Sequence, residues 1–177
     1  MRRFLLMLIV VMLVLSLGAV AQEFPRVQGF LGYAYARNQI QGPTAYNFNG
    51  WNGEVTVNGN RFFGVTGSIS GQYHQVKDGP PLDAYHFLFG PQFTYRNADS
   101  KVAPFGRILL GASKYKVADA SQTEFSYGFG GGLDVKLATH IAARVFQADY
   151  IRTHFANDHQ NNVRLSFGIS IMGGNSQ

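Results

Sequence analysis

Large apolar side chains alternate with small or polar ones along most of this chain. In the segment FSYGFGGGLDVKL, residues 125–137, the odd-numbered positions are mostly Phe, Tyr, Leu and Val, and the even-numbered ones are Ser, Gly, Asp and Lys. A repeat of two residues is that of a β-strand whose two faces meet different surroundings. No convincing helical face follows residue 21, so the pattern predicts an all-β fold.

Eight segments share this alternation, and turn-forming residues separate them. For example, NGNR at residues 58–61 joins two alternating runs as a hairpin requires. The expected sheet is therefore a row of eight strands. The predicted strands are 27–37, 50–58, 62–73, 85–96, 102–116, 125–137, 141–153 and 161–172.

Three positions disturb the alternation. Pro91 would be awkward in a central strand, so we expect a local bulge or kink there that faces the apolar side. Arg107 falls on a face of mixed character in the fifth strand. Arg144 and Gln147 fall on opposite faces of the seventh strand, and a bulge near Phe146 would restore the order.

The connections between the strands alternate between longer and shorter ones. An antiparallel meander with short turns at one end and longer loops at the other is typical of outer-membrane barrels. We therefore expect the chain to run up and down around such a barrel. The longer connections are predicted at 38–49, 77–83, 117–123 and 153–161, and the shorter ones at 58–61, 97–101 and 138–140.

The two faces of the strands indicate the solvent on each side of the sheet. In hydrocarbon each unsatisfied backbone polar group costs several kcal/mol, so a sheet enters a membrane only when it closes and leaves no edge. About ten residues of tilted strand are enough to cross. The apolar face would then contact lipid tails, and the small, polar and charged face would fill a narrow interior. A soluble secreted barrel that carries a ligand would need the reverse arrangement.

The first 21 residues have the pattern of a signal peptide. Two arginines precede the apolar run of residues 4–17, and Ala-Val-Ala at 19–21 fits a signal-peptidase site. A retained membrane anchor is the alternative, because this apolar stretch is nearly long enough to span a bilayer. We expect an exported chain with a signal peptide at 1–21 and one β-barrel domain at 22–177.

Charge and composition narrow the range of partners. The formal charge is +5 at pH 7, and two of the arginines belong to the signal peptide, which leaves +3. No cluster of Lys and Arg remains, so nucleic acid is not an expected partner. The chain has no cysteine, which excludes disulfides and thiolate metal sites.

The ordered set of strand patterns resembles the small eight-stranded outer-membrane β-barrel family, of which the OmpA-type transmembrane domain is the familiar member. The segments that carry the resemblance are FLFGPQFTYR, APFGRILLGAS, FSYGFGGGLDVKL, AARVFQADYIRT and VRLSFGISI. It implies an eight-stranded antiparallel transmembrane barrel in the bacterial outer membrane, with both termini in the periplasm and four loops outside the cell. It also implies assembly by the barrel-assembly machinery, although the sequence ends in GGNSQ and not in the terminal aromatic residue of many members.

Several charged residues fall on the predicted inward face. An unpaired ion in a closed interior would be costly, so these groups must pair with one another. The resemblance implies a lumen plugged by such pairs, with a narrow water path that similar barrels gate by exchanging ion-pair partners. The residues of this predicted network and candidate gate are Glu54, Arg107, Asp134, Lys136, Arg144 and Arg164.

Signals for catalysis or metal binding are weak. The histidines show no HxH or HExxH spacing, so we expect no metal or cofactor site. Some outer-membrane barrels are lipid-modifying enzymes with Ser, His and an acid at the rim. The nearest candidates here are Ser113, His154 and Asp158, which lie in no recognisable motif. GFGGGL at 128–133 is no dinucleotide loop, because the two-residue repeat continues through it and no helix follows.

The sequence leaves three functions open. We favour a structural, anchoring or surface-interaction role, in which a rigid monomeric barrel contacts outer-membrane lipids and displays its loops to an external ligand or surface. The alternatives are a narrow gated pore for small solutes or ions, and a lipid-modifying enzyme. Single-channel conductance would distinguish the pore from the anchor.

Overall fold

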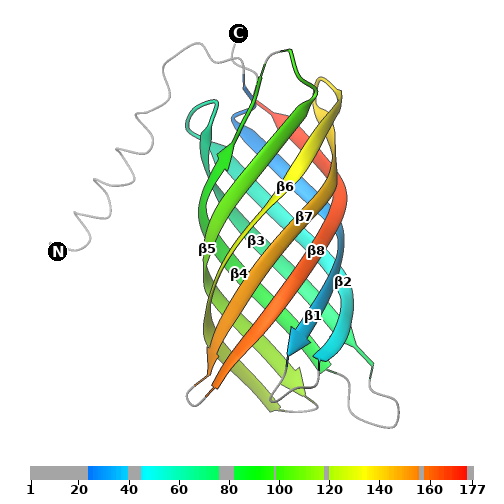
Figure 1. The fold of residues 1–177 in the computed structure, drawn as a ribbon, viewed down its shortest axis with the longest axis vertical. Coiled ribbons are helices and arrows are strands. Elements are labelled where there is room, and N and C mark those ends of the chain that lie inside the picture. The colour runs from blue at the N-terminus through cyan, green and yellow to red at the C-terminus, as the bar shows by residue number, and fades with distance from the viewer. Residues whose placement is uncertain are drawn as a thin grey trace, which may run out of the picture.

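The computed structural model describes residues 24–39, 45–75, 82–97, 99–117, 120–155 and 158–174. Its strands form one closed antiparallel barrel, in which each strand pairs with its neighbours in sequence and β1 pairs with β8. Figure 1 shows the strands tilted around a common axis. The predicted eight-stranded up-and-down barrel is confirmed. The strands are β1 Val27–Gln39, β2 Ala45–Asn58, β3 Phe63–His74, β4 Leu82–Thr94, β5 Val102–Val117, β6 Ala120–Ala138, β7 Ile141–Phe155 and β8 Asp158–Gly173.

Closure places the first and last strands side by side. Val27 of β1 pairs with Gly173 of β8, so both ends of the described chain lie at one end of the barrel, which we call the terminal end. The opposite end is the loop end. The turns at the terminal end are 59–62, 95–101 and 139–140, and the connections at the loop end are 40–44, 75–81, 118–119 and 156–157. Among the described residues no helix is long and apolar enough to cross a membrane.

At the loop end the strands run further than the sequence predicts. The predicted loops at 117–123 and 153–161 are mostly strand, since β5 almost meets β6 and β7 almost meets β8 within them. Strands also extend into the predicted loops at 38–49 and 77–83, and the rest of these two segments lies outside the described residues. The prediction failed because polar residues occupy both faces beyond the apolar band. The two-residue repeat therefore ends there, although backbone pairing continues.

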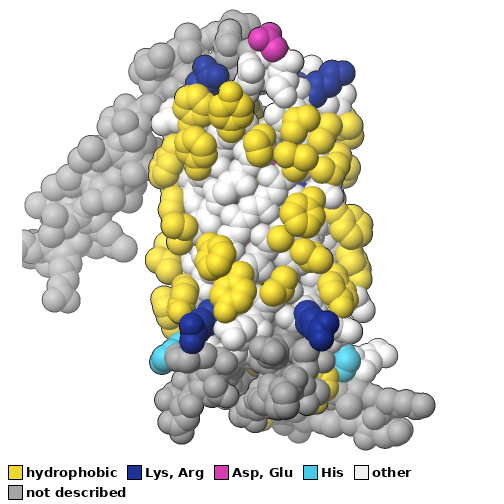
Figure 2. Space-filling view, viewed as in Figure 1, with side chains coloured by type: hydrophobic (Ala, Val, Ile, Leu, Met, Phe, Trp, Pro, Cys, Tyr) yellow, Lys and Arg dark blue, Asp and Glu magenta, His cyan; other side chains and the backbone are white. Residues whose placement is uncertain are grey.

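The two faces of the wall differ as the alternation predicts. In β3, Thr66, Ser68 and Ser70 are buried, whereas Val65 and Ile69 are about half exposed on the outside. Figure 2 shows hydrophobic side chains spread over the outer wall, with Lys and Arg near its two ends. A wall that is apolar outside and polar inside suits hydrocarbon surroundings and is the reverse of a soluble ligand-carrying barrel.

Glycines on the inner face let neighbouring strands approach one another closely. A Cβ atom at Gly90 would overlap the carbonyl oxygen of Ile108, and one at Gly128 would overlap that of Tyr150. No side chain fits at these positions without moving the backbone. The narrow interior therefore requires glycine here.

The bulge predicted in the seventh strand is confirmed. Val145 and Phe146 of β7 are adjacent in sequence and both are about half exposed on the outside. The pairing of β7 shifts by one residue at this point, both against β6 and against β8. As a result, Arg144 and Gln147 both point into the barrel, where each is at most 1% exposed.

The irregularity predicted at Pro91 is confirmed only in part. Pro91 faces the apolar outside, as expected, and pairs with Val65 of β3. The predicted bulge is absent, because the pairing of β4 with β5 keeps one register on both sides of the proline. Proline lacks a backbone N–H, so the strand loses a ladder hydrogen bond there without changing its course.

Candidate functional site

Three arginines and three carboxylates meet inside the barrel. They come from β2, β5, β6, β7 and β8, at positions where the alternation directs side chains inward. Each residue is at most 5% exposed, and their formal charges cancel. We call this set the ion-pair chain. Its members are Glu54, Arg107, Asp134, Arg144, Asp149 and Arg164.

Glu54 lies in the middle of the ion-pair chain. Its Oε2 atom accepts a hydrogen bond from Nη1 of Arg144 at 2.6 Å and forms an ion pair with Nη1 of Arg107 at 2.8 Å. Its Oε1 atom accepts from the side-chain amides of Asn52 at 2.8 Å and Gln147 at 2.9 Å. Two guanidinium groups and two amides therefore satisfy this carboxylate, which offsets the cost of burying its charge.

Each of these arginines also binds a second carboxylate. Arg107 donates from Nε and Nη2 to the two carboxylate oxygens of Asp149, at 2.9 and 2.8 Å. Arg144 donates in the same two-pronged way to Asp134, at 2.7 and 3.1 Å. Arg164 adds a bond from Nη2 to Oδ2 of Asp149 at 2.9 Å. Positive and negative groups thus alternate in the order Asp134, Arg144, Glu54, Arg107, Asp149 and Arg164.

Both ends of the ion-pair chain bind polar groups on other strands. Gln28 of β1 donates from Nε2 to Oδ2 of Asp134 at 2.6 Å. At the other end, Arg164 donates from Nη1 to Ser70 at 2.7 Å and from Nη2 to Ser68 at 3.4 Å, both on β3. The network therefore crosses the lumen and connects opposite parts of the wall.

Aromatic rings complete the surroundings of Arg144. Its guanidinium carbon lies 4.3 Å from the ring centroid of Phe30 and 4.3 Å from that of Phe105. A planar guanidinium packs well against ring faces, and the contact adds cation–π attraction in a desolvated site. The mixed face predicted for the fifth strand is thus real, because Phe105 and Arg107 both point inward.

The structure brings most of the predicted charged residues together, but Lys136 is a correction. It is exposed at the terminal end, beside a register shift between Lys136 and Ala138, and it takes no part in the ion pairs. Lys136 lies near the end of β6, where a side chain on the inward face reaches the open end of the barrel and not its closed lumen. Asp149 was not predicted as part of this network. The bulge predicted near Phe146 was a signal for it, because beyond the bulge Asp149 shares a face with Gln147.

An apolar layer lies next to the ion-pair chain on its loop-end side. Leu88, Leu109 and Ile151 form a buried cluster. Leu109 lies two residues beyond Arg107 on β5, and Ile151 lies two residues beyond Asp149 on β7. Side chains of both kinds therefore fill the middle of the barrel.

A second polar cluster lies further toward the loop end. His86 Nδ1 is 2.6 Å from the Ser113 hydroxyl, which accepts from the Ser126 hydroxyl at 2.7 Å. Ser126 also bonds to Thr153 at 2.9 Å. All four side chains are at most 1% exposed, so a substrate in solution would not reach this His–Ser pair.

The three candidate catalytic residues do not assemble into a triad. Ser113 points inward and contacts His86, whereas His154 is exposed on the outside of the wall. Asp158 is the first residue of β8. Within the ranges that the structure describes, no group of three or more His, Cys, Asp or Glu residues is placed to hold a metal ion.

Comparison with known proteins shows the family to which this chain belongs. The family model described as "Outer membrane protein beta-barrel domain" matches residues 7–170. No curated protein matches the chain.

Solved structures with a similar fold include small barrels from several bacteria. Neisserial surface protein A (NspA) has a TM-score of 0.68 at 11% identity, over 82% of this chain and 96% of that one. OprG of Pseudomonas aeruginosa has a TM-score of 0.60 at 11% identity, over 85% and 97%. Ail, the attachment invasion locus protein of Yersinia pestis, has a TM-score of 0.55 at 19% identity, over 84% and 99%. At these identities the likeness is one of fold.

Proposed function

Because this chain belongs to the outer membrane protein β-barrel family, we propose that it is a non-enzymatic anchor in the bacterial outer membrane. The signal peptide at 1–21 exports it, and the barrel-assembly machinery inserts it as a monomer. Its outer wall contacts lipids, and the loop end faces the outside of the cell. There the connecting segments meet an external ligand or surface.

The observation that carries this proposal is the filled interior. The ion-pair chain crosses the lumen where Glu54 of β2 pairs with Arg107 of β5 and Arg144 of β7. The apolar cluster of Leu88, Leu109 and Ile151 lies beside it. A lumen filled by buried side chains that ion pairs and hydrogen bonds link from strand to strand makes the wall rigid. Such a barrel is suited to holding its ends at fixed positions.

Location and surface exposure provide the test. A peptide epitope inserted after Gly42, between β1 and β2, should bind antibody on intact cells. The same epitope inserted after Gly59, in the turn between β2 and β3, should bind only after the cells are permeabilised. The unboiled protein should migrate differently from the boiled protein on SDS gels. Recovery in the soluble periplasmic fraction, with identical migration of both samples, would contradict the proposal.

A narrow gated pore is the second candidate, and the position of Glu54 favours it. This carboxylate binds Arg107 and Arg144 at once, so either arginine retains a second carboxylate if its bond to Glu54 breaks. Exchange of partners could therefore open a path without leaving an arginine unpaired.

Conductance in planar bilayers separates the two candidates. The gated pore predicts single-channel steps for the wild type and altered steps for Glu54→Ala, with Lys136→Ala as the control at the terminal end. The anchor predicts no steps for any of the three proteins. If the wild type shows conductance steps and Glu54→Ala leaves them unchanged, the gating role of Glu54 is contradicted, whereas the pore itself is supported.

A further inference from the structure

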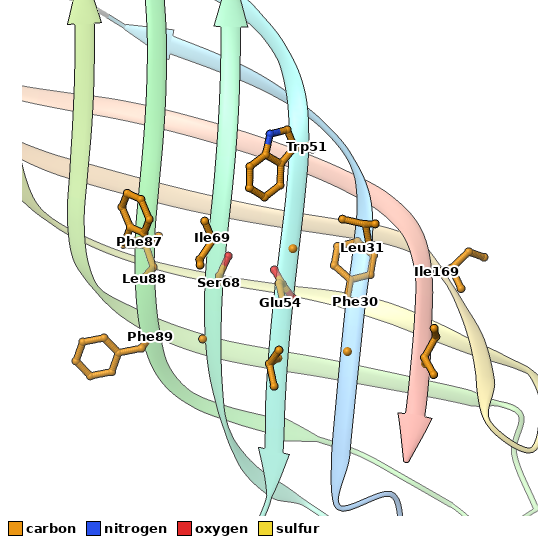
Figure 3. Close-up of a pocket in the computed structure, with 15 residues that line it drawn as sticks. Phe30, Leu31, Trp51, Glu54, Ser68, Ile69, Phe87, Leu88, Phe89 and Ile169 are labelled. Atoms are coloured by element: carbon orange, nitrogen blue, oxygen red, sulfur yellow. The ribbon is translucent and has the colours of Figure 1, made fainter. Parts of the chain in front are cut away.

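A groove lies on the outer wall of the barrel. It has a volume of about 1040 Å³ and follows the outer surface of β8, β1, β2, β3 and β4. Figure 3 shows the side chains that border it, with Trp51 at one end of the group on β2. Its borders include Leu31, Trp51, Ile69, Phe87, Phe89 and Ile169.

Part of the lining of this groove is glycine, at positions where the wall has room for a side chain. Gly29, Gly53 and Gly67 all line the groove. A Cβ atom at Gly29 or Gly67 would meet nothing within 4 Å, unlike one at Gly90 on the inner face. Val55 of β2 pairs with both Gly29 of β1 and Gly67 of β3, so the two open positions flank this one residue. Packing of the wall therefore does not account for the hollow.

A polar pocket continues the groove toward the loop end. It has a volume of about 500 Å³ and its lining includes Asn47, Asn49 and Tyr73. Trp51 lines the groove and Tyr73 lines the polar pocket, and the Nε1 atom of Trp51 lies 3.4 Å from the Tyr73 hydroxyl. Tyr33 donates its hydroxyl hydrogen to Oδ1 of Asn49 at 2.5 Å. Hydrogen-bonding groups thus begin where the apolar lining ends.

A positively charged side chain, that of Arg37, lies beside the polar pocket. Arg37 is exposed on the outside of β1 and pairs with Asn47 of β2. From the groove toward the loop end, the wall therefore presents apolar surface, then amides and hydroxyls, then a guanidinium. This is the order of an acyl chain, its ester linkage and a phosphate headgroup.

We propose that this outer face binds one anionic, phosphate-bearing membrane lipid. The acyl chain lies in the groove, the linkage region contacts Asn49 and Tyr73, and the phosphate pairs with Arg37. A guanidinium matches phosphate geometry, and a chain in the groove gains contacts that a flat wall does not offer. The inference rests on the proposed membrane location and not on the anchoring role.

Trp51 makes the site directly observable. It is the single tryptophan of the chain and it borders the groove, so its fluorescence reports on this face alone. The protein is reconstituted in phosphatidylcholine bilayers that contain brominated phosphatidylglycerol or brominated phosphatidylcholine at equal mole fractions. Brominated chains quench tryptophan on contact. We expect the anionic lipid to bind about fivefold more strongly, the effect of one Arg near an anionic lipid surface.

Two variants, each with a matched control, test the parts of the site. Gly29→Leu with Gly67→Leu fills the groove and should reduce quenching by both lipids, whereas Gly106→Leu, also outward and open, should leave it unchanged. Arg37→Gln should bring the two lipids toward equal quenching, whereas Arg152→Gln on β7 should not. Heat-modifiable migration verifies that each variant is folded.

The outcomes are distinct. Equal quenching by both lipids in the wild type, unaffected by filling the groove, would mean ordinary contact with bulk lipid and would overturn the proposal. Trp51 that is shielded from both lipids, together with chemical crosslinking of two copies, would assign the groove to a second copy of this chain and also overturn it. Failure of the wild type to insert into bilayers would overturn the membrane location and the lipid site together.

Discussion

Single residues of the interior depend on one another because their charges alternate. Arg144 contacts Asp134 and Glu54 through bonds of 2.6 to 3.1 Å, and Phe30 and Phe105 pack against its guanidinium. Its loss would remove both guanidinium bonds to Asp134, which would keep its bond from Gln28, and would leave Glu54 paired with Arg107 alone. Removing one partner of a buried pair usually destabilises a protein more than the pair itself stabilises it.

We therefore predict that Arg144→Ala lowers the free energy of unfolding by about 3–5 kcal/mol. Urea titration of the barrel in lipid vesicles, followed by Trp51 fluorescence, measures this change. Lys136→Ala is the matched control, because Lys136 is exposed at the terminal end and makes no ion pair of the network. Equal midpoints for Arg144→Ala and the wild type would contradict the stabilising role of the ion-pair chain.

At this scale the sequence predicted which side of the wall a charge faces better than it predicted the partners. The two-residue alternation placed Glu54 and Arg164 inside the barrel, where they lie. It placed Lys136 in the network, although Lys136 is exposed at the terminal end, because the alternation does not indicate where the closed part of the lumen ends. It offered no pairing order, since residues 90 positions apart, such as Glu54 and Arg144, meet only through barrel closure.

Among the elements, β7 shows how one extra residue sets the direction of the side chains that follow. The bulge at Val145 and Phe146 shifts the register by one residue against both neighbours. Without it, Arg144 and Asp149 would face opposite sides of the wall. The ion-pair chain needs both inside, so the bulge is part of the site.

Deletions in β7 test this relation. Removing Val145 leaves one outward residue between Arg144 and Gln147 and makes the ladder regular, so we predict that the deletion variant still folds. Removing Tyr150, in the regular part of β7, should abolish folding, because it turns either Asp149 or Ile151 toward lipid. Refolding into detergent followed by the heat-modifiable band on SDS gels measures both. A folded Tyr150 deletion would contradict the assigned register.

The sequence predicted the number and order of strands because the apolar band imposes a two-residue repeat wherever a strand crosses it. The strand ends at 117–123 and 153–161 were not predictable in this way, since neither face there meets hydrocarbon and the repeat is lost. Pairing between neighbouring strands, such as Lys116 with Ser121, extends them instead. Backbone pairing leaves no mark in the pattern of side chains.

For the whole molecule, closure between β1 and β8 is the step that removes the last free edges. Gly32 and Gly168 face each other across this seam, and a Cβ atom at Gly168 would overlap the backbone of Gly32 and the carbonyl oxygen of Leu31. Every backbone group at an unclosed seam would be exposed to hydrocarbon, where each costs several kcal/mol. The stability of the barrel therefore depends on a close approach at one pair of glycines.

We predict that Gly168→Ala weakens the seam and lowers the free energy of unfolding by about 1–3 kcal/mol, the usual cost of overpacking. The unboiled form should then convert to the unfolded form at a lower temperature on SDS gels, and the urea midpoint should fall. Gly106→Ala is the control, because its Cβ would lie on the outside of β5 with its nearest atom, the oxygen of Gly130, at 3.9 Å. If both variants resist heat and urea as well as the wild type, the strands tolerate a wider seam, and closure does not limit the stability of this barrel.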